Sequence, residues 1–592
     1  METSIHREKQ NKFLAIEIGI IIGIFAIAIF WTWIFTEKPL DDAYIFCRYA
    51  NNFIRGHGLV FNLGQHVEGY SSYLFQMLTC LAAFFHIPND LFLQGQGIFF
   101  YFITIMLLAL FAKKHFGHLF YLSVPFLYVS SLANNIWAGM GLETMLFAFM
   151  LLSTVIFYLE FNQSRWQRIF VGLWGCLLSM TRPEAVAYYL VILAFEFFYE
   201  WVARKKVNIT SLLDYSIGLW IFIFYIYSRW HYYGYLMPNT YYVKVGINMT
   251  TLAHGLSFLS NFINDSFGGT LIFSLVVICG ILLKKGKVWW LLMGISLVSF
   301  LMDILSGGSS WPCWRYALPC RPILVFLLGD FLFSAFLFMR RAHGFWKYTQ
   351  MFLVCFLLIF IPFQSTYTIL KDSWSFGLPQ NTAGYFPWGK LYGLLFKEML
   401  SGHQSLALDP IPIVSYYYDG WTYDMLGLTE SKIAHRNLEM GKRSHDHEKG
   451  DGYYILSMRP TVILLGNMGI HPLPQHGYPQ PNDFYFLSDQ EITGQKDFSR
   501  LYQPYNLYIP AAGGYLYLFK LKQEQIKPVP RLKIKTIFKE SVGMDHYWDK
   551  KLNDRILDKV TYFYSNFLLE NNLYLPYKSI QDVFYLKGIS GY

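Results

Sequence analysis

Residues 13–54 read FLAIEIGIIIGIFAIAIFWTWIFTEKPLDDAYIFCRYANNFI. This stretch begins with a long apolar run, and two adjacent aspartates follow a few residues after the run ends. The run exceeds the roughly 20 residues that a helix needs to cross a bilayer. It is too long for the apolar core of a signal peptide and lacks a small-residue cleavage site. We therefore expect an uncleaved first membrane span near residues 13–36.

The composition of the whole chain agrees with a membrane protein. Of the 592 residues, 54% are apolar and 15% are charged, whereas about a quarter of a soluble protein is charged. Long apolar runs recur up to Pro362 and then cease. We predict a transmembrane domain over 1–363, with a large first external loop at 37–95, and a soluble domain over 364–592. The net charge of +9 comes in short clusters between apolar runs, which favours a role in topology over nucleic-acid binding.

Six basic clusters are expected on the cytoplasmic side, because Lys and Arg accumulate there. They are Arg7, Lys9 and Lys12; Lys113 and Lys114; Arg165 and Arg168; Arg204 to Lys206; Lys284, Lys285 and Lys287; and Arg340 and Arg341. These clusters predict about eleven transmembrane helices, at 13–36, 96–112, 118–134, 144–160, 168–180, 184–201, 213–230, 267–283, 288–303, 319–338 and 347–363. The run from Tyr73 to Phe85 is short for a span and must then not cross. An odd number of crossings puts the C-terminal domain on the opposite face from the N-terminus, outside the cytoplasm.

The first external loop carries the paired acids Asp41 and Asp42. Ile45, Tyr49 and Phe53 recur every four residues and predict an amphipathic helix lying on the membrane, which Gly56 and Gly58 end. Helix capping is one interpretation of the two acids. The other is catalytic, since repulsion between adjacent carboxylates makes one a better proton acceptor, and a general base can deprotonate an acceptor hydroxyl. A divalent cation held by the pair stays open as a cofactor.

Ionisable residues also occur at the ends of later apolar runs. Glu143 begins one run, and Arg182 and Glu184 lie in a short turn at membrane depth, where a substrate site or a mutual ion pair would explain them. Guanidinium and ammonium groups can bind the phosphate of a leaving group, or simply extend toward lipid phosphates. The candidate phosphate-binding residues are Arg182, Lys244, Arg315 and Arg321.

The cysteines do not indicate a disulfide framework. Seven are scattered through the chain, all before residue 364. Cys313 and Cys320 bracket a short external segment, so they form either a disulfide or two ordinary thiols. In the soluble part, the segment 445–451 gathers His445, Asp446, His447, Glu448 and Asp451. Their spacing fits no standard zinc pattern, and a solvated loop is the alternative.

Seven motifs in order resemble a known family. They are DDAYIFCRYANNFIRGHGLVFNLGQHVEGYSSYLF (41–75), WAGMGLET (137–144), LLSMTRPEA (177–185), YYGYLMPNTYYVK (232–244), RYALP (315–319), YDMLGLTESKIAH (423–435) and HEKGDGYYILSMRP (447–460). They resemble the GT-C glycosyltransferases, and among these the terminal arabinofuranosyltransferases of the mycobacterial envelope and their Gram-negative relatives. Relatives often have an acid after the paired glycines of the late loop, where this chain has Gly307, Gly308 and Ser309.

The resemblance implies an enzyme that takes a sugar from a polyprenyl monophosphate and adds it to an envelope glycan outside the cytoplasmic membrane. It implies Asp42 as the base, with Asp41 as a helper. The expected substrate-binding residues are Arg48, Glu143, Glu184, Asn239, His447 and Glu448. The sugar is arabinofuranose or another pentose or hexose, and the richness in Lys, Ile, Asn and Phe favours a lipopolysaccharide acceptor over arabinan. An oligosaccharide ligase or polymerase that uses a pyrophosphate lipid, and a transporter, are the alternatives. The chain shows no repeat of the kind that transporters often have.

The soluble domain is predicted to be mixed α/β. Apolar runs with β-branched or aromatic residues, at 411–417 (IPIVSYY), 461–466 (TVILLG) and 514–521 (GYLYLFKL), are expected to form strands among helical stretches.

Overall fold

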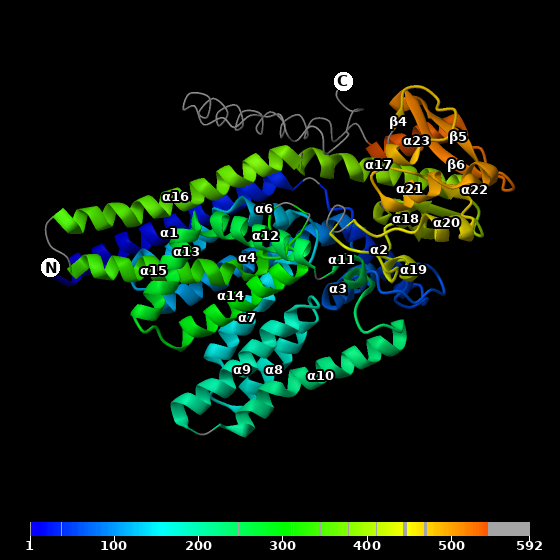
Figure 1. The fold of residues 1–592 in the computed structure, drawn as a ribbon. Coiled ribbons are helices and arrows are strands. Elements are labelled where there is room, and N and C mark those ends of the chain that lie inside the picture. The colour runs from blue at the N-terminus through cyan, green and yellow to red at the C-terminus, as the bar shows by residue number, and fades with distance from the viewer. Residues whose placement is uncertain are drawn as a thin grey trace. The chain divides into compact units, whose positions relative to one another are not determined.

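The computed structural model describes residues 2–36, 38–205, 207–246, 248–309, 311, 313–341, 345–376, 378–409, 411–441, 447–466 and 470–542. The chain forms two compact units (Figure 1). Unit 1 comprises Met1–Ala43, Tyr70–Trp374 and Glu439–Asp446, and unit 2 comprises Tyr44–Gly69, Ser375–Leu438 and His447–Tyr592. The units part after Trp374, eleven residues later than the predicted domain boundary, and part of the first loop joins unit 2.

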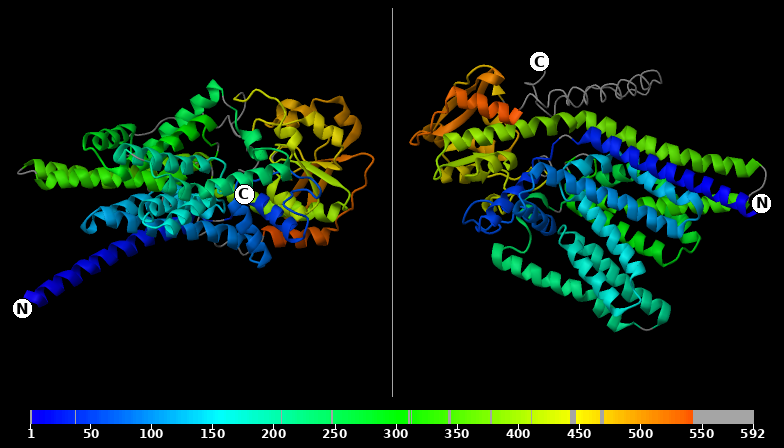
Figure 2. Two further views of the ribbon diagram at one scale, coloured as in Figure 1. Left: turned by 90° about the horizontal axis from the view of Figure 1, so that it is seen from below. Right: turned by 180° about the vertical axis from the view of Figure 1, so that it is seen from behind.

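Unit 1 is a helical bundle (Figure 2). Its helices are α1 (Glu2–Phe35), α3 (Tyr73–Phe84), α4 (Asn89–His115), η1 (His118–Leu122), α5 (Ser123–Val129), α6 (Leu132–Gly139), α7 (Thr144–Glu160), α8 (Arg165–Ser179), α9 (Ala185–Arg204), α10 (Ile209–Tyr233), α11 (Asn239–Lys244), α12 (Met249–Phe267), α13 (Thr270–Leu282), α14 (Lys287–Ser306), η2 (Leu318–Cys320), α15 (Arg321–Arg341) and α16 (Phe345–Phe376).

Several of these helices suit a membrane. Among the described residues, five are long and apolar enough to cross, or up to seven if each of two bent pairs, α6 with α7 and α12 with α13, forms one span. The predicted count of eleven is not confirmed. The predicted span at 118–134 divides into η1, α5 and the start of α6. Helix α8 has 15 residues, which extend roughly 22 Å and fall short of a bilayer core of about 30 Å.

Ion pairs fix which helix ends lie together. Lys113, near the end of α4, lies 2.6 Å from Glu17 in the N-terminal half of α1. Its neighbour Lys114 pairs with Glu160 at the end of α7. If the twelve-residue α3 crossed the membrane, α4 would run in the same direction as α1. Lys113 would then lie at the end of the bundle opposite Glu17. The structure thus agrees with the prediction that the Tyr73–Phe85 run does not cross.

Close backbone contact joins α8 and α10 beside the main bundle. A Cβ atom added to Gly218 would lie 1.8 Å from the carbonyl oxygen of Gly172. Only glycine permits this approach, and small residues at helix contacts are typical of packing in membranes. At one end of the same pair of helices, the guanidinium of Arg168 lies 2.9 Å from the Asp214 carboxylate.

Unit 2 contains a six-stranded mixed sheet. Its strands are β1 (Ser405–Leu408), β2 (Trp421–Asp424), β3 (Val462–Ile463), β4 (Ile470–His471), β5 (Tyr502–Ile509) and β6 (Gly514–Leu521). The order is β2-β1-β3-β6-β4, with β5 also paired to β6. Strand β1 is parallel to β2 and β3, whereas β6 is antiparallel to its partners. The helices of this unit are α2 (Ala43–Ile54), α17 (Leu378–Met399), α18 (Pro412–Tyr418), α19 (Ser431–Ala434), α20 (Gly452–Met458), η3 (Pro481–Asp483), α21 (Leu487–Thr493), α22 (Lys496–Leu501), η4 (Pro510–Ala512) and α23 (Arg531–Val542).

The mixed α/β character of the soluble part agrees with the prediction, but one expected strand is wrong. Residues 461–466 and 514–521 contain β3 and β6, whereas 411–417 falls almost wholly in the helix α18. Pro412 occupies the first turn of α18, where its missing N–H is not needed. The strands beside it, β1 and β2, are short and less apolar, and the sequence pattern missed them.

The first external loop contributes to the α/β unit. The expected helix is α2, and it ends before Gly56, whose φ is +83°. Ile45 and Tyr49 of the predicted apolar face are buried within the protein, whereas Phe53 is exposed. Tyr44 of α2 is also buried, against Tyr416 of α18, with ring centroids 5.3 Å apart. The side chain of Asn62 then pairs with the backbone of Thr422, donating to its carbonyl at 2.9 Å and accepting from its N–H at 3.1 Å. Asn62 thereby caps the edge strand β2.

Candidate functional site

Helix connectivity gathers five predicted site residues at one end of the unit 1 bundle. Asp42 follows α1, Glu143 precedes α7, Arg182 and Glu184 join α8 to α9, and Arg315 precedes α15. The opposite ends of α1, α4 and α7 are those that carry the pairs of Lys113 and Lys114. The candidate site and the basic cluster of Lys113 and Lys114 therefore lie at opposite ends of these helices.

Glu143 is the centre of the cluster. One of its oxygens, Oε1, lies 2.6 Å from Nη1 of Arg182 and 3.5 Å from Nη2 of Arg315. The Glu143 side chain is fully buried, and its second oxygen accepts no hydrogen bond from the described residues. A single carboxylate thus orients two guanidinium groups.

Arg182 is held tightly between two acids. Besides Glu143, its Nε lies 2.5 Å from Oε1 of Glu184, and its guanidinium stacks 4.9 Å from the ring centre of Tyr316. The mutual ion pair of Arg182 and Glu184, one of the two interpretations of the TRPEA turn, is therefore present. It coexists with a position inside the cluster.

Arg315 is held more loosely and lies beside Asp42. Its Nη1 is 3.8 Å from Oδ2 of Asp42, and its Nε has no hydrogen-bond partner among the described residues. The Asp42 side chain keeps 24% of its surface exposed, whereas Arg315 keeps 8%. Arg315 therefore has donors that a bound anion can use, next to a carboxylate that solvent or substrate can reach.

The turn that carries Arg315 has an uncommon backbone. Cys313 and Trp314 have φ values of +62° and +60°, which residues other than glycine rarely adopt. The indole N–H of Trp137 donates to the carbonyl of Cys313 at 3.1 Å, and the same ring lies 5.5 Å from the Arg315 guanidinium. Trp137 thus holds both the turn and the side chain that the turn presents.

The sequence analysis missed Asp303, Trp137 and Tyr316 as members of the cluster. Asp303 lies in the last turn of α14, 3% exposed, where the charges of Arg182 and Glu184 act on it. A lone carboxylate within an apolar helix was the available signal. Trp137 and Tyr316 gave no such signal in the sequence, because aromatic residues are common at every membrane boundary.

Other predicted site residues lie elsewhere in unit 1. Asp41 is half-buried in the turn before α2, Asn239 begins α11 and is buried, and Lys244 ends α11 half-buried. Arg321 begins α15 and makes a buried ion pair with Asp265 of α12, and its second Nη lies 3.4 Å from the Ser365 hydroxyl. Because Arg321 already has a carboxylate partner, its contacts favour a structural role over the predicted phosphate binding.

The predicted substrate residues of unit 2 also make structural contacts. Arg48 donates to the carbonyls of Phe61, Ser415 and Gly420, which ties α2 to α18 and leaves the side chain 5% exposed. Burial lowers the pKa of Arg48 to about 10. His447 is half-buried beside Phe486, with ring centroids 5.9 Å apart, and Glu448 is buried. His445 and Asp446 lie outside the described residues, and Asp451 caps α20 by accepting from the N–H of Tyr454 at 2.9 Å.

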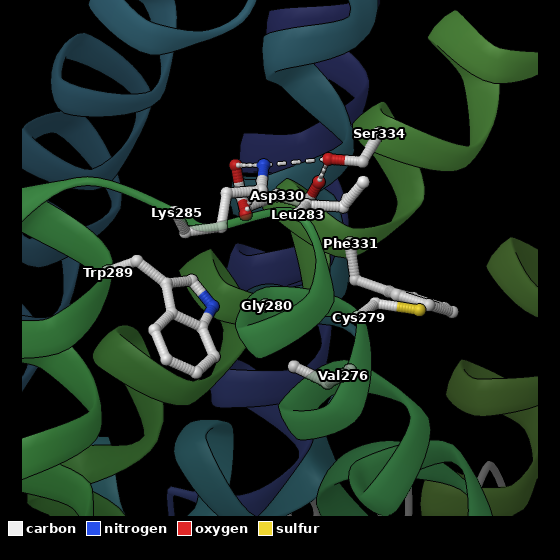
Figure 3. Close-up of a pocket in the computed structure, with 9 residues that line it drawn as sticks. All are labelled: Val276, Cys279, Gly280, Leu283, Lys285, Trp289, Asp330, Phe331 and Ser334. Atoms are coloured by element: carbon white, nitrogen blue, oxygen red, sulfur yellow. Dashed lines mark hydrogen bonds and ion pairs between the residues drawn. The ribbon is translucent and has the colours of Figure 1, made fainter.

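Neither a disulfide nor a metal cluster occurs in the described parts of the chain. Cys313 and Cys320 are both buried and form no disulfide, so the disulfide interpretation is wrong. The described residues contain no group of three or more His, Cys, Asp or Glu side chains suited to hold a metal. A small cavity of about 10 Å³ beside α13–α15, room for one water molecule, contains the contact of Lys285 with Asp330 and Ser334 at 2.9 and 2.8 Å (Figure 3). It involves one of the basic clusters, and none of the candidate site residues lines it.

A second set of buried acids lies in unit 2, after the parallel strands. Asp409 follows β1, Asp424 ends β2, and Asp489 is in α21, and all three are buried. Asp424 accepts from the backbone N–H groups of Leu426 and Thr429, whereas both oxygens of Asp409 lack a hydrogen-bond partner among the described residues. Burial raises the pKa of Asp409 and of Asp489, and the negative charge of Asp489 raises that of Asp409 further.

These raised pKa values predict a pH-dependent stability. Between about pH 4 and pH 8 the unfolded chain releases protons that folded Asp409 and Asp489 retain, so stability should fall as pH rises through this range. Asp489→Asn, which needs no ionisation, should raise the melting temperature of the full chain at pH 8 by about 4 °C or more and change it little at pH 4. Thermal unfolding at both pH values measures this. Asp497→Asn, at an exposed site, is the control, and an equal shift at both pH values would contradict the expectation.

Comparisons with solved structures give matches at low sequence identity. No protein-family model matches the chain, and no curated protein matches its sequence. The solved structure of ArnT from Cupriavidus metallidurans in the apo state is 11% identical, with a TM-score of 0.46 over 70% of this chain and 86% of that chain. ArnT bound to undecaprenyl phosphate is 10% identical, with a TM-score of 0.46 over 68% and 85%. An oligosaccharyltransferase from Archaeoglobus fulgidus, in complex with Zn and sulfate, is 13% identical, with a TM-score of 0.48 over 89% and 76%. Every one of these TM-scores is below 0.5, so the matches assign no function to this chain.

Proposed function

We propose that the protein is a membrane glycosyltransferase that moves a sugar from a polyprenyl monophosphate to an envelope glycan, such as lipopolysaccharide or arabinan, on the periplasmic face of the inner membrane. The observation that carries the proposal is the contact of Asp42 with Arg315 at the end of an apolar helical bundle. A base and a phosphate-binding group must lie close together in such an enzyme, because the acceptor hydroxyl attacks the carbon that the phosphate leaves.

The roles follow from the contacts of each group. Asp42, the more exposed partner, takes the proton from the acceptor hydroxyl. Arg315 donates to the phosphate of the donor, since its N–H groups are not saturated by the carboxylates at 3.5 and 3.8 Å. Arg182, with its two short contacts, holds Glu143 and Glu184 in place and adds a second positive charge beside Arg315.

The charge balance of the cluster bears on a cofactor. Asp42, Glu143 and Glu184 supply three negative charges, and Arg182 and Arg315 supply two positive ones. A phosphodiester donor adds one more negative charge. A divalent cation bound with the donor would reduce this excess of negative charge, and Asp42 and Asp41 are the side chains proposed to hold it.

Purified full-length protein, incubated with a panel of synthetic prenyl-phospho-sugars and a lipid-linked glycan acceptor, tests the proposal. We expect transfer from one monophosphate donor and none from the matching pyrophosphate-linked oligosaccharide. Transfer only from the pyrophosphate donor would instead indicate the ligase or polymerase, and no transfer with flipping of the donor across vesicles would indicate a transporter. A parallel series with chelator shows whether a cation is needed.

The tryptophan that holds the Arg315 turn gives a second test of the site. Trp137→Phe keeps an aromatic face but removes the N–H bond to Cys313, and a neutral hydrogen bond contributes about 0.5–1.5 kcal/mol. We expect the KM for the donor to rise about 2- to 12-fold with a smaller change in kcat. Trp174→Phe removes a comparable bond, to Ser153 at 2.8 Å, outside the cluster and is the control. Equal effects of the two substitutions would count against a role of Trp137 at the site.

A further inference from the structure

Asp303 is an acid in a place where acids are costly. Helix α14 reads KVWWLLMGISLVSFLMDILS and passes the length and hydropathy expected of a membrane span. Asp303 is its single acidic residue and is 3% exposed. Ionisable residues inside membrane helices are rare and usually serve a function.

The backbone around Asp303 is rigid. The N–H of Gly308 donates to its carbonyl at 2.9 Å. Gly255 of α12 packs so closely that an added Cβ would lie 2.4 Å from the carbonyl of Ile304 and 2.9 Å from that of Asp303. Two helices and a glycine turn therefore fix the backbone that carries the Asp303 side chain, as a recognition group requires.

The carboxylate is not needed as a counter-ion. Arg182 and Glu184 are close enough to act on it electrostatically, but the short contacts of Arg182 go to Glu143 and Glu184. One oxygen of Asp303, Oδ2, is buried and accepts no hydrogen bond from any described residue. An unsatisfied buried acceptor costs about 1–3 kcal/mol, more when it is charged, and this cost is recovered when a ligand brings a donor.

The chemistry of the surroundings selects the ligand group. A phosphate oxygen would be repelled by the carboxylates of Asp303 and Glu184, and the described residues hold no third metal ligand here. A neutral hydroxyl supplies the missing donor without adding charge. The sugar of the proposed donor carries several hydroxyls beside its phosphate.

We infer that Asp303 accepts a hydrogen bond from a hydroxyl of the donor sugar and thereby determines which sugar the enzyme transfers. The inference rests on the proposed function and deepens it. A site built to bind a hydroxyl discriminates strongly against an analogue that lacks it, because the buried acceptor then stays unpaired.

A cycle of enzyme and substrate changes tests this. The wild type, Asp303→Ala and Asp303→Asn are assayed with the accepted prenyl-phospho-sugar and with each of its monodeoxy analogues. A neutral hydrogen bond contributes about 0.5–1.5 kcal/mol, so Asp303→Ala should lower kcat/KM about 2- to 12-fold with the parent donor. One deoxy analogue should lose a similar factor with the wild type and nothing further with the Ala variant.

The controls separate the inference from the proposed function. Asp330→Asn changes another acid of a membrane helix, paired with Lys285 in a basic cluster, and should leave the deoxy pattern unchanged. Asp303→Asn keeps the volume and one acceptor oxygen, so it reports on recognition even if the Ala variant does not fold. If every deoxy analogue lowers kcat/KM by the same factor in either variant as in the wild type, the role of Asp303 is overturned, while transfer itself stands. Absence of transfer by the wild type from every monophosphate donor would overturn the proposed function first.

Discussion

Asp42→Asn should lower sugar transfer by about 10²- to 10⁴-fold, the contribution expected of a general base. The substitution keeps the size of the side chain and removes its ability to take a proton. The Asp42 contact with Arg315 is long, at 3.8 Å, and the side chain is 24% exposed, so little stability depends on it. Transfer from a saturating prenyl-phospho-sugar, together with the melting temperature, measures both quantities.

The neighbouring acid provides the matched control. Asp41→Asn should reduce transfer far less if Asp41 only caps α2 or assists, and the same assay with and without a divalent cation distinguishes a cap from a ligand. Should Asp42→Asn retain full activity while Asp41→Asn loses it, the base would be Asp41. Full activity of both variants would remove the pair from the mechanism.

The cluster was predicted from the sequence by a single physical rule: ionisable groups at membrane depth are energetically costly and therefore usually serve a structural or functional role. Glu143, Arg182, Glu184 and Arg315 all interrupt or begin apolar runs, and the structure brings them within 4 Å of one another in pairs. The rule identified the residues but not their partners. Arg321 satisfied it equally well, yet its partner Asp265 lies 56 residues away on α12. No local pattern distinguishes these two arginines.

The fold was predictable to a similar degree. Long apolar runs predicted α1, α4, α10, α14 and α15, because hydropathy is a property of the run itself. The count of crossings failed where helices are broken or short, as at η1 and α8, since tertiary packing decides whether such pieces span. The membership of the first loop in the α/β unit depends on Arg48 and Asn62 contacting carbonyls more than 350 residues away, as with Ser415 and Thr422, which no sequence window contains.

Substitutions of Arg315 and Arg321 should have contrasting effects, the first on sugar transfer and the second on stability. Arg315→Ala should lower transfer by at least about 10- to 150-fold, the loss of a charge-assisted hydrogen bond to phosphate, and leave the melting temperature nearly unchanged. Its contacts at 3.5 and 3.8 Å contribute little to the fold. Arg321→Ala should instead cost about 3–5 kcal/mol of stability, because the carboxylate of Asp265 would remain buried without a partner.

A double substitution decides what Arg321 does. Replacing a buried ion pair by apolar side chains of similar size is often neutral or stabilising, so Arg321→Met with Asp265→Leu should recover the stability that Arg321→Ala loses. If Arg321 is structural, as its contacts with Asp265 and Ser365 indicate, the double variant should also recover transfer. A stable double variant without activity would return Arg321 to the phosphate-binding set. Glu143, the buried carboxylate beside Arg315, keeps its closer partner Arg182 when Arg315 is removed. No equivalent rescue is therefore expected for Arg315→Ala, and activity would separate the two arginines even where their sequence context does not.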